Sequence, residues 1–99
     1  MKLSEAIRAG AALRPQAHGE YVINYWNGPS RTCAIGAAYE GITGKLPDPD
    51  WADDLNRVRK TIYKATGADD VLLNTVIQLN DDQYQTREQI ADWLEAQGL

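Results

Sequence analysis

Cys33 and His18 are the residues of this 99-residue sequence whose types could together support covalent catalysis. A nucleophilic thiol needs a base within hydrogen-bond reach, and imidazole is a common one. Cys33 is expected in the first turn of a helix, where unpaired amide N–H groups lower the pKa of a thiol. The pair therefore fits a small cysteine-dependent hydrolase, although a free cysteine is more commonly a small buried apolar residue.

Aromatic side chains gather in one short segment beside a turn. Tyr21, Tyr25 and Trp26 come just before the turn-forming residues 27–30, and Arg31 follows that turn. Tyrosine, tryptophan and arginine are enriched where proteins meet partners. If these rings are exposed, the segment is a partner-binding surface, and if helices cover both of its faces, it completes the core.

Asn80 and Asp81 follow the apolar stripe of a predicted helix and precede a polar loop. If the chain folds back so that they approach Thr32 and Cys33, their oxygens could cap the helix ends that meet there. They could instead line a small polar pocket, which would make the chain a small-ligand-binding domain. Capping is the more common use of these residue types.

No metal or cofactor is expected from the sequence. Zinc prefers four ligands, usually Cys and His, and the chain offers one of each. Four aspartates between residues 48 and 54 lack the central glycine and the distal glutamate of a calcium loop. The glycines at 36, 41 and 44 do not have the spacing of a phosphate-binding loop.

The charge pattern bears on partners and location. The chain has a net charge of -4, and residues 45–99 hold six basic and eleven acidic side chains. Without a basic stripe, nucleic-acid binding is not expected, because that binding depends on clustered Lys and Arg. We find no apolar run of about 18 residues and no signal peptide, so a cytoplasmic location without membrane contact is expected.

The elements that must position these residues are mostly helical. The sequence predicts a single globular domain, residues 1–99, built as a compact bundle of about five helices with one short extended or β segment near residues 20–26. The predicted helix starts are a cap at Ser4, a cap at Ser30 or Thr32, the pair Asp48-Pro49, Asp69 or Asp70, and a capping box of Thr86 with Gln89.

Apolar spacing predicts which helix faces turn inward. The stripe of the third helix, which should end at Thr66, includes Trp51 and Leu55, and the last helix presents Trp93. Small residues in the first two helices, Gly10 among them, predict that these two helices approach each other closely.

Three short motifs make this chain similar to a known group of proteins. Residues 33–37 read Cys-Ala-Ile-Gly-Ala, residues 80–81 read Asn-Asp, and residues 86–93 read Thr-Arg-Glu-Gln-Ile-Ala-Asp-Trp. With these motifs the chain resembles a small uncharacterised family of bacterial and phage proteins. The resemblance implies a compact helical protein from bacterial or mobile-element genomes, and it brings no activity, substrate or cofactor with it.

These observations favour a non-enzymatic protein that acts by protein–protein contact, as a regulatory or accessory factor of a bacterial mobile element. Its expected partner is another protein, not nucleic acid or a membrane. The candidate contact residues are Tyr21, Tyr25, Trp26, Arg31, Cys33, Asn80 and Asp81. The hydrolase that uses Cys33 with His18 and the small-ligand-binding domain are the alternatives.

Overall fold

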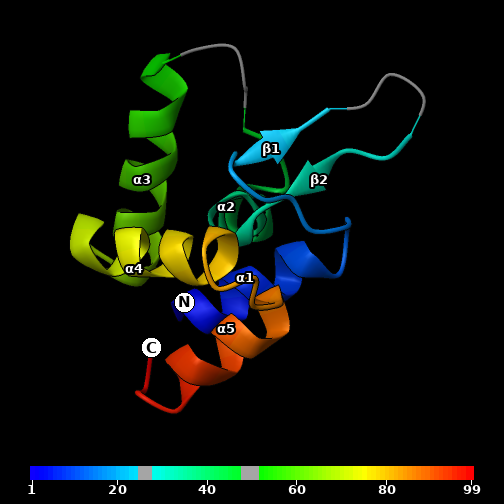
Figure 1. The fold of residues 1–99 in the computed structure, drawn as a ribbon. Coiled ribbons are helices and arrows are strands. Elements are labelled where there is room, and N and C mark those ends of the chain that lie inside the picture. The colour runs from blue at the N-terminus through cyan, green and yellow to red at the C-terminus, as the bar shows by residue number, and fades with distance from the viewer. Residues whose placement is uncertain (25–27, 48–51) are drawn as a thin grey trace.

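A computed structural model describes residues 1–24, 28–47 and 52–99, and for residues 52–54 it describes the backbone alone. These residues form five helices and a two-stranded antiparallel sheet (Figure 1), which confirms the predicted mostly α bundle with a short β segment. In chain order the elements are α1 (Leu3–Ala11), β1 (Val22–Ile23), β2 (Arg31–Thr32), α2 (Ala34–Thr43), α3 (Ala52–Thr66), α4 (Asp70–Asp81) and α5 (Arg87–Glu95).

Helices α1 and α2 cross at a contact made of small residues, as their composition predicts. A Cβ atom added to Gly10 would lie 1.8 Å from the carbonyl oxygen of Ala37. One added to Gly41 would lie 2.1 Å from the carbonyl oxygen of Ala6. Because real Cβ atoms do not approach backbone this closely, glycine at both positions sets the distance between the two helices.

The short β segment is a hairpin with a third stretch of chain beside it. Val22 pairs with Thr32 and Ile23 with Arg31. On the other edge of β2, the amide of Thr32 donates to the carbonyl of Pro15 (3.0 Å), and the amide of Ala17 donates to the carbonyl of Thr32 (2.9 Å). The sequence predicts β1 within residues 20–26, because it lies in a run of β-branched and aromatic residues, but it does not predict β2, which has no such run around it.

Two predicted helix caps are wrong. Ser4 lies inside α1, where its hydroxyl is buried and donates to the backbone oxygen of Leu99 (2.9 Å). Thr32 belongs to β2, and the N-cap of α2 is Cys33, which has no side-chain capping bond. Helix α1 therefore begins two residues before the position that a cap at Ser4 predicts. Helix α2 begins one residue after the position that a cap at Thr32 predicts and three after that for Ser30.

The other starts and the core follow the apolar spacing more closely. Asp69 caps α4 by accepting from the amide of Leu72 (2.9 Å), and Thr86 with Gln89 forms the predicted capping box of α5. The largest buried apolar side chains come from five helices and β1: Leu3, Ile7, Val22, Ile35, Val58, Ile62, Leu73, Val76, Ile90 and Leu94.

Two side chains predicted to face inward are exposed. Leu55 is 47% exposed, because the first part of α3 projects past α2 (Figure 1), whereas Val58 and Ile62 on its later turns are buried in the core. Trp93 is 39% exposed, since Ile90 and Leu94 already fill the narrow buried stripe of α5. The predicted start at Asp48-Pro49 and the predicted core residue Trp51 lie outside the described residues.

Candidate functional site

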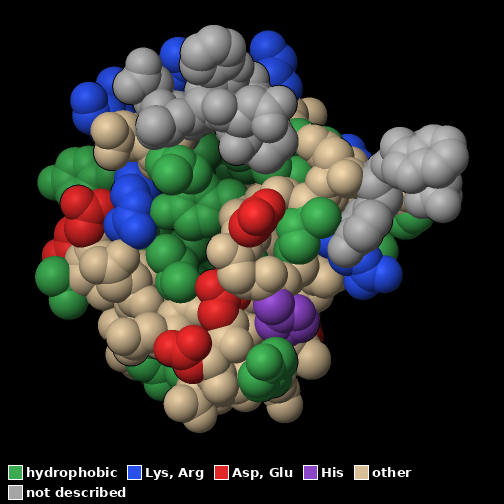
Figure 2. Space-filling model, turned by 45° about the horizontal axis from the view of Figure 1, so that its top comes forward, with side chains coloured by type: hydrophobic (Ala, Val, Ile, Leu, Met, Phe, Trp, Pro, Cys, Tyr) green, Lys and Arg blue, Asp and Glu red, His purple; other side chains and the backbone are tan. Residues whose placement is uncertain are grey.

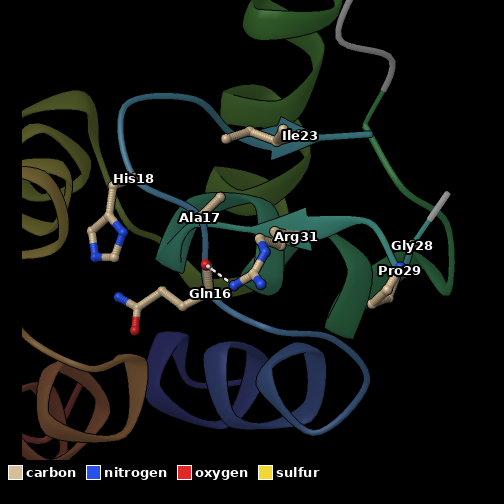
Figure 3. A pocket seen from close by; sticks show the side chains of 7 residues that line it. All are labelled: Gln16, Ala17, His18, Ile23, Gly28, Pro29 and Arg31. Carbon is tan, nitrogen blue, oxygen red and sulfur yellow. Dashed lines mark hydrogen bonds between the residues drawn. The ribbon is translucent and has the colours of Figure 1, made fainter. Parts of the chain in front are cut away.

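An open hollow of about 530 Å³ lies between the β-hairpin and the segment that follows α1 (Figure 3). We call this hollow the hairpin groove, and it is lined by Gln16, Ala17, His18, Ile23, Gly28, Pro29 and Arg31. His18, Pro29 and Arg31 are exposed, while Ala17 is buried beneath them. The groove thus presents an imidazole and a guanidinium around a small apolar surface.

One rim of the groove continues into the loop between α4 and α5. The ring of His18 contacts the ring of Tyr84, with 5.3 Å between centroids and an angle of 44°. Tyr84 is 73% exposed and has a φ of 50°, a left-handed conformation that is costly for a bulky residue. A strained backbone that holds an exposed ring is a feature found at binding sites.

Asn80 holds the floor of the groove from below. Its side chain is fully buried, and its Oδ1 accepts from the amide of Ala34 (3.1 Å) and from Nε2 of Gln16 (2.9 Å). Its Nδ2 donates to the carbonyl of Ala17 (2.9 Å) and to Oδ1 of Asp81 (2.7 Å). Asn80 therefore caps the first amide of α2 and anchors two groove residues, while Asp81 accepts from its amide.

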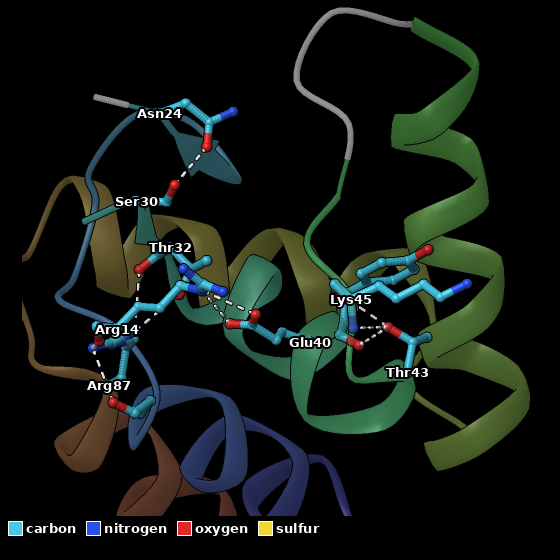
Figure 4. Close-up of polar contacts among 10 residues, drawn as sticks. Arg14, Asn24, Ser30, Thr32, Glu40, Thr43, Lys45 and Arg87 are labelled. Carbon is cyan, nitrogen blue, oxygen red and sulfur yellow. Dashed lines mark hydrogen bonds and ion pairs between the residues drawn. The ribbon is translucent and has the colours of Figure 1, made fainter. Parts of the chain in front are cut away.

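Gln16 and the hairpin arm are held by further hydrogen bonds. Nε2 of Gln16 also donates to the carbonyl of Gln85 (2.8 Å), which ties the groove to the loop that carries Tyr84. The hydroxyl of Ser30 donates to Oδ1 of Asn24 (2.7 Å) across the arm of the hairpin (Figure 4). Both walls of the groove are thereby fixed to the fold.

A second buried network lies beneath β2 (Figure 4). The guanidinium of Arg87 donates to Oγ1 of Thr32 (2.9 Å) and to the carbonyls of Ala11 and Arg14. Burial lowers the pKa of Arg87 from its ordinary value. The side chain of Arg14 in turn pairs with the buried carboxylate of Glu40, 2.9 Å from Nε. These groups join α5, β2, α2 and the end of α1.

Cys33 does not have the environment of a nucleophile. Its side chain is buried at the N-cap of α2 and is absent from the groove lining in which His18 lies. Burial raises the pKa of the thiol to about 11, and the amides of Gly36 and Ile35 offset only part of this effect. The expected lowering of this pKa is therefore wrong, because desolvation outweighs the helix terminus, and the thiol stays protonated near neutral pH.

Of the predicted aromatic surface, Tyr21 is described and is half-buried. Its hydroxyl accepts from Nε of Arg59 (3.0 Å), and that guanidinium also donates to Oδ1 of Asp70 (3.1 Å). Burial raises the pKa of Tyr21, and the positive charge of Arg59 offsets part of this increase. Tyr25 and Trp26 lie outside the described residues.

The structure separates the predicted site residues into two layers. Arg31 lines the groove, whereas Cys33 at the N-cap of α2 and Asn80 on α4 are buried, and Asp81, which accepts from Asn80, is partly buried. Sequence reasoning missed the groove residues Gln16, Ile23 and Pro29 and the rim residue Tyr84. No local pattern marks them, because the fold alone brings three distant loops together.

Within residues 1–24, 28–47 and 52–99, no three His, Cys, Asp or Glu side chains are grouped so that they could hold a metal ion. None of the helices in the described part of the chain has the length and apolar character needed to cross a membrane. Comparisons of the chain with protein-family models, with curated proteins and with solved structures found no match.

Proposed function

We propose that this chain is a non-enzymatic binding module that recognises another protein through the hairpin groove. The proposal rests on one observation, namely which polar groups are buried and which are exposed. The thiol is buried with a raised pKa, and the buried amide of Asn80 uses both its oxygen and its nitrogen on protein groups. The exposed groups of the groove are a guanidinium, an imidazole and a proline, which suit binding.

The groove fits a protruding segment of a partner. Its volume of about 530 Å³ can accept a few side chains. Ile23 offers an apolar contact, Arg31 supplies hydrogen-bond donors, and the ring of Tyr84 extends the rim. Aromatic and arginine side chains of this kind contribute much of the affinity at protein interfaces. Because Asn80 and Ser30 hold the walls in place, little ordering is needed when a partner binds.

The setting of this function is also a proposal. The resemblance of residues 33–37, 80–81 and 86–93 to a bacterial and phage family supports a role as an accessory or regulatory factor of a mobile element. A single free cysteine is compatible with the reducing cytoplasm, which is the location that we propose.

The test is site-specific photo-crosslinking in the cells that produce the protein. A benzophenone amino acid replaces Pro29 at the groove, and the control replaces Glu5, which is exposed on α1. We expect a discrete protein adduct from position 29 that position 5 does not give. Equal adducts at both positions, or none at position 29, would overturn the proposal. An adduct with a small molecule instead of a protein would favour the ligand-binding alternative.

A further inference from the structure

The outer face of α3 is a second surface with a distinct charge. Between Leu55 and Thr66 the chain holds four cationic side chains and no acidic one, although the net charge of the whole chain is -4. Lys60, Lys64 and Tyr63 are exposed on this stretch, and Tyr63 is 57% exposed. In the net charge of residues 45–99 these cations are outweighed by acidic residues, among them Asp53 and Asp54 in the first turn of α3 and Asp69 and Asp70 after its end.

Two hollows flank a ridge on this helix. One has a volume of about 410 Å³ and is lined by Asn56, Arg57, Lys60, Thr61 and Lys64. The other has a volume of about 310 Å³ and is lined by Asn56, Arg59, Lys60, Tyr63, Lys64, Ala68, Asp69 and Asp70. Asn56, Lys60 and Lys64 belong to both, and their spacing of four residues places them in one row along the helix.

Arg59 and the two lysines of α3 have different roles. Arg59 has a structural role, since its guanidinium donates to Tyr21, to Asp70 and to Oδ1 of Asn74 (2.9 Å). Lys60 and Lys64 form the ridge, and among the residues that the structure describes no carboxylate lies within ion-pair distance of either ammonium. Their charge is therefore available to an incoming group.

The remainder of the molecule limits which anion can approach. On α5, three carboxylates surround the single guanidinium of Arg8, at 2.9 Å (Glu88), 2.6 Å (Asp92) and 2.8 Å (Glu95), so that face carries excess negative charge. Figure 2 shows another face, on which Lys and Arg lie at the upper edge and at both sides, and Asp and Glu lie at the left edge, at the centre and lower down. A long polyanion bound to α3 would extend to these carboxylates and be repelled by them. A short acidic segment could stay within about 8 to 10 Å of the α3 cations, which is one Debye length and therefore the range over which their charge acts.

We propose that the α3 face, formed by Asn56, Arg57, Lys60, Tyr63 and Lys64, docks an acidic segment of a protein partner. Carboxylates of that segment pair with Lys60 and Lys64, and an apolar side chain of the segment packs on the ring of Tyr63 in the smaller hollow. Charge complementarity selects the partner, and the ridge fixes where its carboxylates lie. This docking surface does not depend on the hairpin groove, and either could fail without the other.

The experiment selects binders from a displayed library of random 12-residue peptides on the immobilised full chain. The test variant is K60Q/K64Q, and the matched control is Lys2→Glu, which changes the net charge by the same amount at an exposed residue of another element. We expect selected peptides to be rich in Asp and Glu with an aromatic or aliphatic residue. We expect K60Q/K64Q to weaken their binding about tenfold and Lys2→Glu to weaken it less than about twofold.

Three results would overturn this inference. One is a set of selected peptides without acidic enrichment, and another is an equal loss of binding in K60Q/K64Q and in Lys2→Glu. The third is duplex DNA of 12 base pairs that binds more tightly than the peptides and shows the same dependence on Lys60 and Lys64. That result would assign the α3 face to nucleic acid.

Discussion

At the scale of single residues, Asn80 and Cys33 show how burial decides what a polar side chain does. Asn80 donates twice and accepts twice inside the protein, so its amide is a structural connector between α4, α2 and the groove floor. Cys33 lies beside the same helix end, yet its raised pKa keeps it neutral. Neither residue lines the groove, and the role of both is to stabilise the structure around it.

Replacing Asn80 with Asp should destabilise the fold strongly. The substitution turns a donor into an acceptor, which then faces the carbonyl of Ala17 and the carboxylate of Asp81. We expect the free energy of unfolding to fall by about 3 kcal/mol in a urea titration. Asn74→Asp is the control on the same helix, since its exposed Oδ1 accepts from Arg59 and remains an acceptor, and a loss below about 0.5 kcal/mol is expected there.

The Cys33 thiol should be unreactive in the native protein at pH 8 and should react with a thiol reagent only after unfolding. The pKa of this thiol is about 11 in the folded chain and lower in the unfolded chain, so the thiol ionises more readily after unfolding. The folded state therefore keeps its full stability at neutral pH and loses part of it as the pH rises from about 9 to 11. A Cys33→Ala variant should therefore lose less stability across this window. Rapid labelling of the folded chain at pH 8 would show that the thiol is accessible and would contradict the assignment.

At the scale of elements, the close crossing of α1 and α2 is the contact most sensitive to size. Gly10→Ala improves helix propensity by about 1 kcal/mol but places a methyl group against the carbonyl of Ala37, 1.8 Å away before any shift. We expect a net loss above about 2 kcal/mol, measured by thermal and urea unfolding. Ala9→Gly, at an exposed position of the same helix, should cost only about 1 kcal/mol. A neutral or stabilising Gly10→Ala would mean that the helices are farther apart than described.

The elements also show which features a sequence can reveal. Periodicity and local caps predict α4, with Asp69, and α5, with Thr86, because these signals depend only on neighbours along the chain. The pairing of β2 with both β1 and residues 15–17 depends on contacts distant in sequence, so it could not be predicted. The groove residues could not be predicted for the same reason. The exposure of Leu55 depends on which other elements reach this turn of α3, and that too is a contact between distant parts of the chain.

At the scale of the whole molecule, Arg87 joins parts of the chain that lie more than 50 residues apart. Its guanidinium donates to Thr32, Ala11 and Arg14, which belong to β2 and to the end of α1. Arg87→Met keeps the apolar volume but leaves these oxygens without their donor, and we expect a loss of about 3 kcal/mol in the free energy of unfolding. Arg8→Met, whose ion pairs are exposed, should lower stability less, and the opposite order would contradict this role.

The whole molecule presents two surfaces on one rigid support. The hairpin groove offers a guanidinium and an imidazole with the ring of Tyr84 on its rim, and the α3 face offers a ridge of lysines. The packing of α1 against α2 and α5 forms the support for both surfaces.

The affinity of purified variants for the partner captured at position 29 distinguishes a function in the groove from a function of the thiol. Titration calorimetry should show that Arg31→Ala weakens binding at least about tenfold, while Cys33→Ala stays within about twofold of the original chain. The account is contradicted if Cys33→Ala abolishes binding while Arg31→Ala leaves it unchanged.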